Sequence, residues 1–171
     1  SQDNWISLNG SAPQFPQVQI EQLDMTGLTI TIEVPGMYTE TVVQDGIEYQ
    51  QLRFEAWQTL HQVGLPELPV LSEVIALPGD KLVKVKILET SSVVIDDMLV
   101  YPAQTPSKDV LNGQYTGFDI NQDYYNSDAV FPEVMASTNR PGIWRDVKVA
   151  GLHICPFQYK AASRQLEVMT S

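Results

Sequence analysis

His153 and Cys155 are the residues whose types and spacing come closest to a covalent catalytic pair. A cysteine nucleophile needs a base within hydrogen-bond reach, and side chains at positions i and i+2 of a strand share one face. The run that holds the pair is apolar, however, and free cysteines are among the most buried residues in proteins. No third group is apparent that would orient the histidine. The pattern therefore favours packing over catalysis, and we predict that the chain is not an enzyme.

An acidic segment offers a second kind of chemistry, the binding of a hard metal ion. Oxygen-bearing side chains occupy alternate positions at Asp119, Asn121 and Asp123, as at the start of a calcium loop. The rest of such a loop is missing, because Tyr124 stands where glycine is needed and Val130 stands where a bidentate glutamate should be. We interpret the segment as a solvated acidic loop and expect no cofactor, with calcium as the alternative.

A group of aromatic residues surrounds this acidic segment. Its members are Tyr115, Phe118, Tyr124, Tyr125 and Phe131. Exposed rings of this kind can line a sugar-binding face, whereas buried rings fill a core and hold a loop in place. The sequence favours packing and leaves the glycan-binding face as the alternative.

Charge and cysteine content exclude several classes of function. Ten basic residues against 21 acidic ones give a net charge of −11, and binding to nucleic-acid phosphates needs a clustered basic surface. A single cysteine excludes an intrachain disulfide framework and a four-cysteine zinc site. No apolar run approaches the length of about 20 residues that spans a bilayer. We therefore expect neither a nucleic-acid partner nor insertion into a membrane.

The elements that must position these residues are predicted to be strands. Residues 28–34 alternate between apolar and polar side chains, and Asp45-Gly46 is a strong hairpin-turn signal. Residues 47–57 fit a strand better than a helix. The proline-rich linker of residues 64–69 is expected to be stiff and extended. It precedes two alternating runs that predict a hairpin, with its turn at residues 77–80 and its second strand at residues 82–87.

Short alternating runs, 11 prolines and almost no helical periodicity predict an all-β fold. The expected architecture is an antiparallel β-sandwich of jelly-roll or immunoglobulin-like type, with about ten strands. Residues 1–17 are expected to form an extended N-terminal arm, and residues 18–171 a single domain. The polar stretch from Pro102 to Tyr125 lacks periodicity, and long irregular segments of this kind in compact domains tend to be functional.

Several proline-rich segments of the chain resemble the propeptide of gingipain-type cysteine proteases. The resemblance begins with GLPELPV at residues 64–70 and IALPG at residues 75–79. Later segments agree with it, and these are Tyr101-Pro102 with Pro106, residues 124–132, residues 145–149, and CPFQY at residues 155–159. The similarity covers residues 45–168 and rests on proline spacing and strand pattern rather than on a catalytic motif.

The resemblance implies a zymogen propeptide. A β-sandwich prodomain of this family precedes a caspase-like cysteine protease catalytic domain, assists its folding as an intramolecular chaperone, and blocks its active-site cleft until cleaved. Such proteases are exported across the outer membrane, which implies a secreted or cell-surface location. In the family a basic residue on a prodomain loop enters the primary specificity pocket. Lys108 in the long loop is the candidate for that contact here, and Arg140 in a second loop is the alternative.

A function of another class fits the same composition. The chain could be a non-catalytic cell-surface module that binds a glycan or a protein through the aromatic stretch from Tyr115 to Phe131. Binding of a glycan to such a face would change tyrosine and tryptophan fluorescence, which distinguishes this alternative from the propeptide hypothesis.

Overall fold

The structure, a computed structural model, describes residues 4–24, 27–76, 83–106, 117–139 and 142–171. Strands dominate these ranges, together with one short helix, α1 (Gln122–Tyr125). The strands are β1 (Asn4–Ser7), β2 (Gln17–Asp24), β3 (Gly27–Glu33), β4 (Gly36–Gln44), β5 (Ile47–Arg53), β6 (Gln58–Thr59), β7 (Pro69–Ala76), β8 (Ser92–Ile95), β9 (Val130–Phe131), β10 (Ala136–Thr138), β11 (Gly142–Trp144), β12 (Val147–Ile154), β13 (Phe157–Lys160) and β14 (Gln165–Met169). Their pairing is antiparallel throughout, so the predicted all-β antiparallel class is confirmed.

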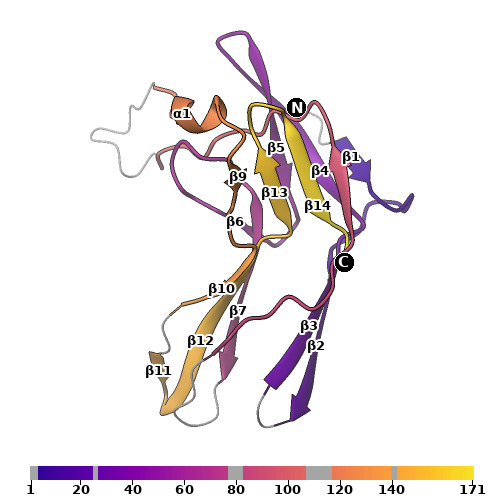
Figure 1. Ribbon diagram of the computed structural model, residues 1–171, viewed down its shortest axis with the longest axis vertical. Helices are drawn as coiled ribbons and strands as arrows, with labels where there is room; N and C mark the ends of the chain where they lie inside the picture. Colours follow the sequence, from indigo (N-terminus) through magenta and orange to yellow (C-terminus); the bar gives the residue numbers. More distant parts are fainter. Residues whose placement is uncertain (1–3, 25–26, 77–82, 107–116, 140–141) are drawn as a thin grey trace.

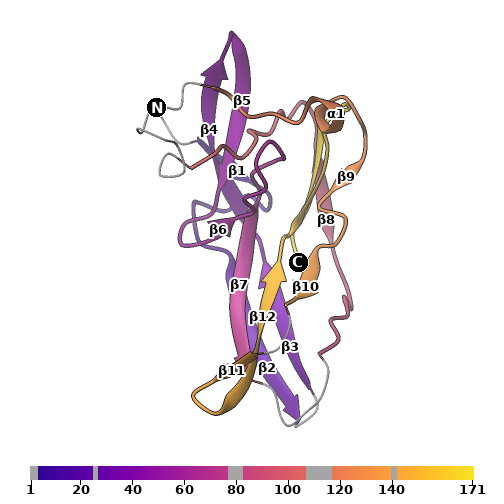
Figure 2. The same cartoon turned by 90° about the vertical axis from the view of Figure 1, so that its left-hand side faces the viewer.

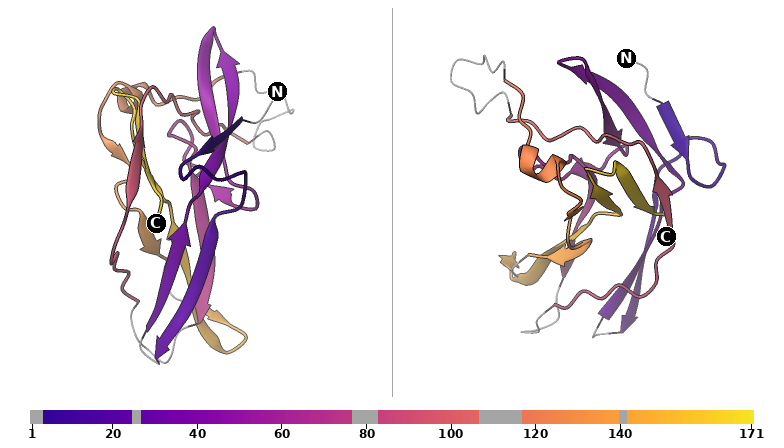
Figure 3. Two further views of the ribbon diagram at one scale, coloured as in Figure 1. Left: turned by 90° about the vertical axis from the view of Figure 1, so that its right-hand side faces the viewer. Right: turned by 45° about the horizontal axis from the view of Figure 1, so that its top comes forward.

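The strands form two layers that face each other. One layer holds a sheet in the order β1-β4-β5, and the other holds a sheet in the order β8-β14-β13-β9. Both sheets lie in the upper half of Figure 1, and Figure 2 shows the two layers from the side. Below them extend the β2-β3 hairpin and the sheet β10-β12-β7-β6, to which β11 adds through β12. The left view in Figure 3 shows the elongated shape that results.

The hydrophobic core fills the space between the two upper sheets. Alternate side chains of β13 and β14 point inward, and Phe157, Tyr159, Leu166 and Val168 are all inaccessible to solvent. This arrangement follows from the period of two along a strand, which sends every second side chain to one face. Other buried side chains of the cluster include Met37, Leu52, Leu68 and Val100.

The hydroxyl group of Tyr159 lies within this core. It donates a hydrogen bond to the carbonyl of Met98 at 2.7 Å and accepts one from the backbone N–H of Val100 at 3.2 Å. Burial raises the pKa of Tyr159, so the hydroxyl keeps the proton that it donates. The side chain therefore ties β13 to the segment that follows β8 while it fills the centre of the core.

Three of the local predictions from the sequence are confirmed. The run at residues 28–34 forms most of β3, and residues 47–53 form β5 rather than a helix. The turn between β4 and β5 lies at Asp45 and Gly46, whose φ angles are +50° and +78°. Positive φ at both central residues is what a tight antiparallel hairpin requires, and Asp-Gly tolerates it.

The hairpin predicted for residues 70–87 is wrong. β7 forms as expected, but it pairs with β12 and β6, and residues 83–90 form no strand. These residues instead cross between the layers to reach β8, which pairs with β14 (Figure 1). Their apolar side chains consequently gain little burial, and Leu88 is 67% exposed. Alternation alone cannot make a strand when no neighbouring backbone is present to pair with it.

The N-terminal stretch is tied to the sandwich within its first residues. Of the predicted arm at residues 1–17, Asn4–Ser7 forms β1 and pairs with β4. A Cβ atom at Gly36 would collide with the Trp5 indole and the Ile6 carbonyl, so only glycine allows β1 to lie this close. The boundary at residue 17 remains a prediction, although β2 begins there.

Tyr159→Phe is expected to destabilise the fold by about 1–3 kcal/mol, because it leaves two buried backbone groups without their partner. Urea denaturation measures the change. Tyr38→Phe serves as the control, since the Tyr38 side chain is partly exposed and its loss should stay within about 0.5 kcal/mol. Equal stability of the two variants would show that the Tyr159 hydroxyl contributes nothing to the fold.

Candidate functional site

Side-chain hydrogen bonds join the two ends of the long loop at its base. Gln104 before the loop and Asp119 after it are joined by two hydrogen bonds, from Gln104 Nε2 to the Asp119 carbonyl at 2.8 Å and from the Asp119 N–H to Gln104 Oε1 at 2.9 Å. The Asp119 carboxylate also accepts from the backbone N–H and the hydroxyl of Thr105, at 2.8 and 2.7 Å. We call these three residues the loop clamp.

The loop clamp stands on a backbone framework formed by the proline-rich linker. Gly64 donates to the Ala103 carbonyl at 2.8 Å and accepts from the Asn121 N–H at 2.9 Å, while Ala103 donates to the Leu65 carbonyl at 2.9 Å. Gly64 has a φ of +85°, and a Cβ atom there would lie 3.0 Å from the Asn121 nitrogen. Glycine is therefore needed for the linker to meet both ends of the loop.

Aromatic packing supports the same region. The ring of Phe118 lies 5.4 Å from Tyr49 and 6.0 Å from Tyr101, measured between centroids. Such tilted pairs add to the burial of the rings. Burial also raises the pKa of Tyr49 and of Tyr101, so both remain neutral. The segments that flank the long loop are thus held together at its base, near α1 in the upper half of Figure 1.

The residues predicted for the inhibitory contact lie outside the described residues. In the sequence, Lys108 falls between the described residues Pro106 and Gly117, and Arg140 falls between β10 and β11. What the structure shows is how the flanking segments of Lys108 are held. Gln104 and Thr105 hold these segments by bonding to Asp119. The sequence did not predict their role, because side chains 14 and 15 positions apart carry no pairing signal.

The three candidate calcium ligands have separate structural tasks. Asp119 belongs to the loop clamp, and Asn121 caps α1 by accepting from the Tyr124 N–H at 3.0 Å. Asp123 lies in the first turn of α1, where a carboxylate interacts favourably with the backbone N–H groups at the helix N-terminus. Within the ranges that the structure describes, no group of three or more His, Cys, Asp or Glu side chains is arranged to hold a metal ion.

His153 and Cys155 are close in sequence but are bonded to different groups. His153 Nδ1 lies 3.0 Å from the hydroxyl of Ser72, whereas the Cys155 thiol is directed to the Phe157 carbonyl at 3.8 Å. Cys155 is 3% exposed, and burial raises the pKa of its thiol to about 12. A protonated, enclosed thiol is a poor nucleophile.

The aromatic residues after the loop pack into the fold. The Tyr125 hydroxyl donates to the Val100 carbonyl at 2.7 Å, and the Tyr124 hydroxyl donates to the Tyr159 carbonyl at 3.0 Å. Phe131 lies 5.9 Å from the Tyr124 ring. Tyr115 lies outside the described residues. The described rings therefore hold α1 and β9 against the core and do not form one exposed face.

Comparison with known proteins gives a family match and several relatives. The family model described as Propeptide_C25 matches residues 9–171. Gingipain R2 of Porphyromonas gingivalis is 24% identical over 156 residues, which are 91% of this chain and 21% of the relative. Gingipain R1 of the same organism is 26% identical over 114 residues, covering 65% of this chain and 11% of the relative. The chain thus spans about a fifth or less of the length of these relatives.

Two solved structures share the fold. The chain superposes with a TM-score of 0.81 on a structure described as a complex of Porphyromonas gingivalis RgpB pro- and mature domains, at 21% identity, covering 92% of this chain and 82% of that one. The TM-score is 0.83 for a structure described as an insight into zymogenic latency of gingipain K from Porphyromonas gingivalis, at 20% identity, covering 99% of this chain and 94% of that one.

Asp119→Ala is expected to loosen the base of the long loop, because Thr105 loses both of its hydrogen bonds to the carboxylate. Amide hydrogen exchange at Thr105 should become faster by about tenfold or more, which corresponds to about 1.4 kcal/mol. Asp123→Ala removes an exposed carboxylate nearby and should leave that exchange unchanged. If the two variants exchange alike at Thr105, the loop clamp does not hold the base.

The Cys155 thiol should resist labelling in the folded protein. With its pKa near 12, the thiolate fraction in mildly alkaline buffer is on the order of one in ten thousand, and the thiolate is the reactive form. Reaction with a chromogenic disulfide reagent should therefore be slow in the native state, accelerate as pH rises, and be rapid in guanidinium chloride. Rapid native-state labelling would overturn the inert role given to Cys155.

Proposed function

The chain belongs to the Propeptide_C25 family, and we propose that it acts as the propeptide of a cysteine protease, which it helps to fold and keeps inactive until cleavage. The observation that carries the proposal is the family match over residues 9–171, which includes β4, β5 and the whole sheet β8-β14-β13-β9. The chain itself would contribute no catalytic group, which agrees with the buried and protonated thiol of Cys155.

The proposed partner is a caspase-like catalytic domain in the same precursor. The relatives support this proposal through their length, because the matched region is only 21% of gingipain R2. The structure that pairs pro- and mature domains of RgpB has the same fold in its matched part. An intramolecular partner is present at high effective concentration, so a modest interface is enough for inhibition before cleavage.

The proposed inhibitory contact is a basic side chain from the long loop in the specificity pocket of the protease. Lys108 is the candidate, with Arg140 as the alternative. The loop clamp supports the first choice, because Gln104, Thr105 and Asp119 hold both ends of the loop that carries Lys108. A loop whose ends are held loses less entropy on docking, and a cation in an acidic pocket supplies an anchor contact.

The net charge of −11 adds a long-range component to this contact. It favours a catalytic domain with a basic rim and speeds their association at low salt. We also propose that the precursor is exported and acts outside the cell or at its surface, as the family implies. No helix in the described ranges has the length and apolar character needed to cross a membrane.

Lys108→Ala is expected to weaken inhibition of the cognate Arg- or Lys-specific cysteine protease by at least about tenfold, or roughly 1.4 kcal/mol, because the pocket loses its cation. The measurement is the inhibition constant of the isolated chain against the mature protease. Lys160→Ala is the matched control, since it removes an exposed lysine from β13. Arg140→Ala tests the alternative.

Three outcomes separate the levels of this proposal. A loss of inhibition confined to Arg140→Ala would transfer the contact to the second loop. Unchanged inhibition in both variants would remove the basic-anchor mechanism while leaving the chain an inhibitor. If the wild-type chain neither inhibits the protease nor raises the yield of its folded form, the propeptide function itself is wrong.

A further inference from the structure

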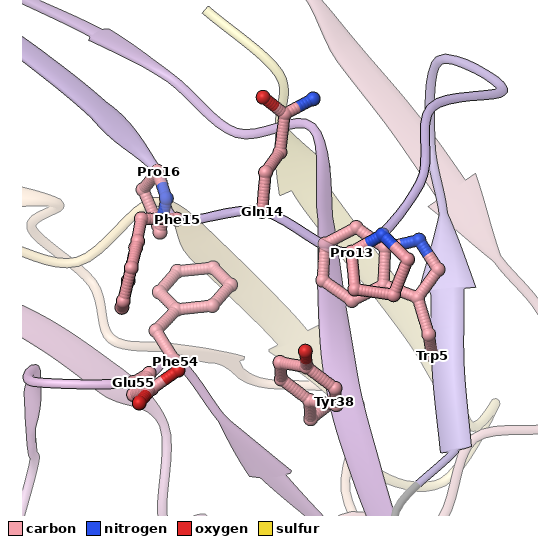
Figure 4. A pocket seen from close by; sticks show the side chains of 8 residues that line it. All are labelled: Trp5, Pro13, Gln14, Phe15, Pro16, Tyr38, Phe54 and Glu55. Carbon is pink, nitrogen blue, oxygen red and sulfur yellow. The ribbon is translucent and has the colours of Figure 1, made fainter.

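A small aromatic pocket lies beneath the N-terminal segment, away from the loop clamp. It has a volume of about 90 Å³ and is formed where the N-terminal segment covers the start of β4 and the end of β5. Its walls, shown in Figure 4, are Trp5, Pro13, Gln14, Phe15, Pro16, Tyr38, Phe54 and Glu55. None of the loop-clamp residues lines it.

The sequence builds this pocket from a fixed strand and a stiff return segment. Trp5 of β1 lies directly opposite Tyr38 of β4, with the ring centroids 5.1 Å apart. The Trp5 indole N–H donates to the Ser11 carbonyl at 3.1 Å, which holds the chain that returns over the sheet. Pro13 and Pro16 then restrict that chain to an extended form. The pocket is therefore formed before any ligand arrives.

The lining favours a positive charge. Four of the eight side chains are aromatic, and the faces of such rings attract cations. Glu55 is exposed and contributes the only charge in the lining, a negative one. Figure 4 shows the Tyr38 hydroxyl directed toward the gap between Phe54 and Pro13, where it can accept a hydrogen bond. Arg53, the cross-strand neighbour of Tyr38, does not line the pocket.

Size and shape narrow the ligand further. A volume of about 90 Å³ admits one side-chain head group rather than a sugar ring with its hydroxyls. A guanidinium is flat, stacks on aromatic rings and can form two parallel hydrogen bonds to a carboxylate, which a lysine ammonium cannot do. The pocket opens at the surface, because Phe15 is 53% exposed. An arginine side chain on another polypeptide can reach it.

We propose that this pocket binds the guanidinium of an arginine residue in an extended segment of a partner polypeptide. The guanidinium stacks on the neighbouring rings of Phe15 and Phe54 and forms an ion pair with Glu55. The inference is independent of the propeptide function, because it rests only on the pocket and not on the long loop or the protease. It gives an acidic domain a specific contact for one basic side chain, in addition to its diffuse attraction for basic surfaces.

The test is a titration with N-acetyl-arginine methylamide, followed through the indole N–H resonance of Trp5 in a nitrogen–proton correlation spectrum. N-acetyl-citrulline methylamide, which has the same shape without the charge, is the control ligand. The indole resonance of Trp144 serves as the internal reference, since Trp144 does not line the pocket, whereas Trp57 packs against Phe54 of its wall. We expect the arginine probe to cause a saturable shift of the Trp5 resonance. The affinity of the citrulline probe should be at least about threefold lower.

Variants separate the pocket from general electrostatics. Glu55→Gln should weaken binding of the arginine probe by about threefold or more, and so should Phe15→Ala. Glu48→Gln removes an exposed carboxylate from β5 outside the pocket and should leave the affinity unchanged. Equal binding of the two probes, equal effects of the two glutamate variants, or absence of a saturable shift would each overturn the proposal. Because Glu55 and Phe15 are exposed, neither substitution removes a core side chain.

Discussion

The structure depends on one crossing of backbone segments, where residues 64–68 run against residues 101–103. Gly64, Leu65 and Glu67 exchange hydrogen bonds with Ala103 and Tyr101 across this crossing. The segment of residues 99–101 is bonded in turn to Gln50 of β5 on its other side. The linker residues that donate across the crossing are Gly64 and Glu67, whereas its prolines have no N–H to donate. These backbone hydrogen bonds join the three segments into one unit.

This crossing lies between the hydrophobic core and the base of the long loop. The core behind it is closed by Tyr159, whose hydroxyl binds Met98 and Val100 just before the crossing. In front of it the loop clamp joins the two ends of the long loop. A propeptide inhibitor needs this combination, since a loop that presents an anchor residue binds tightly only when its ends are already ordered.

The acidic residues of the chain have a long-range effect through the net charge and a local effect at Glu55. As a total charge of −11 it attracts basic surfaces over a distance set by ionic strength. At Glu55 a single carboxylate stands beside aromatic rings, where the direction and distance of a cation matter. In the inhibitory contact that we propose, Lys108 would instead present a cation to an acidic pocket on the protease. The two kinds of contact have opposite polarity, so they can select for different features of a partner.

The sequence by itself determined the all-β class and the β4–β5 hairpin, because alternation and Asp-Gly act through neighbours within a few residues. Tertiary structure alone decided that residues 83–90 cross between layers, since a strand needs a partner that the local pattern does not name. It also decided the role of Asp119. The spacing with Asn121 and Asp123 suggested metal ligands, whereas folding brought Gln104 and Thr105 to that carboxylate from across the loop. Contacts between residues far apart in the chain depend on the whole path between them, which no short pattern encodes.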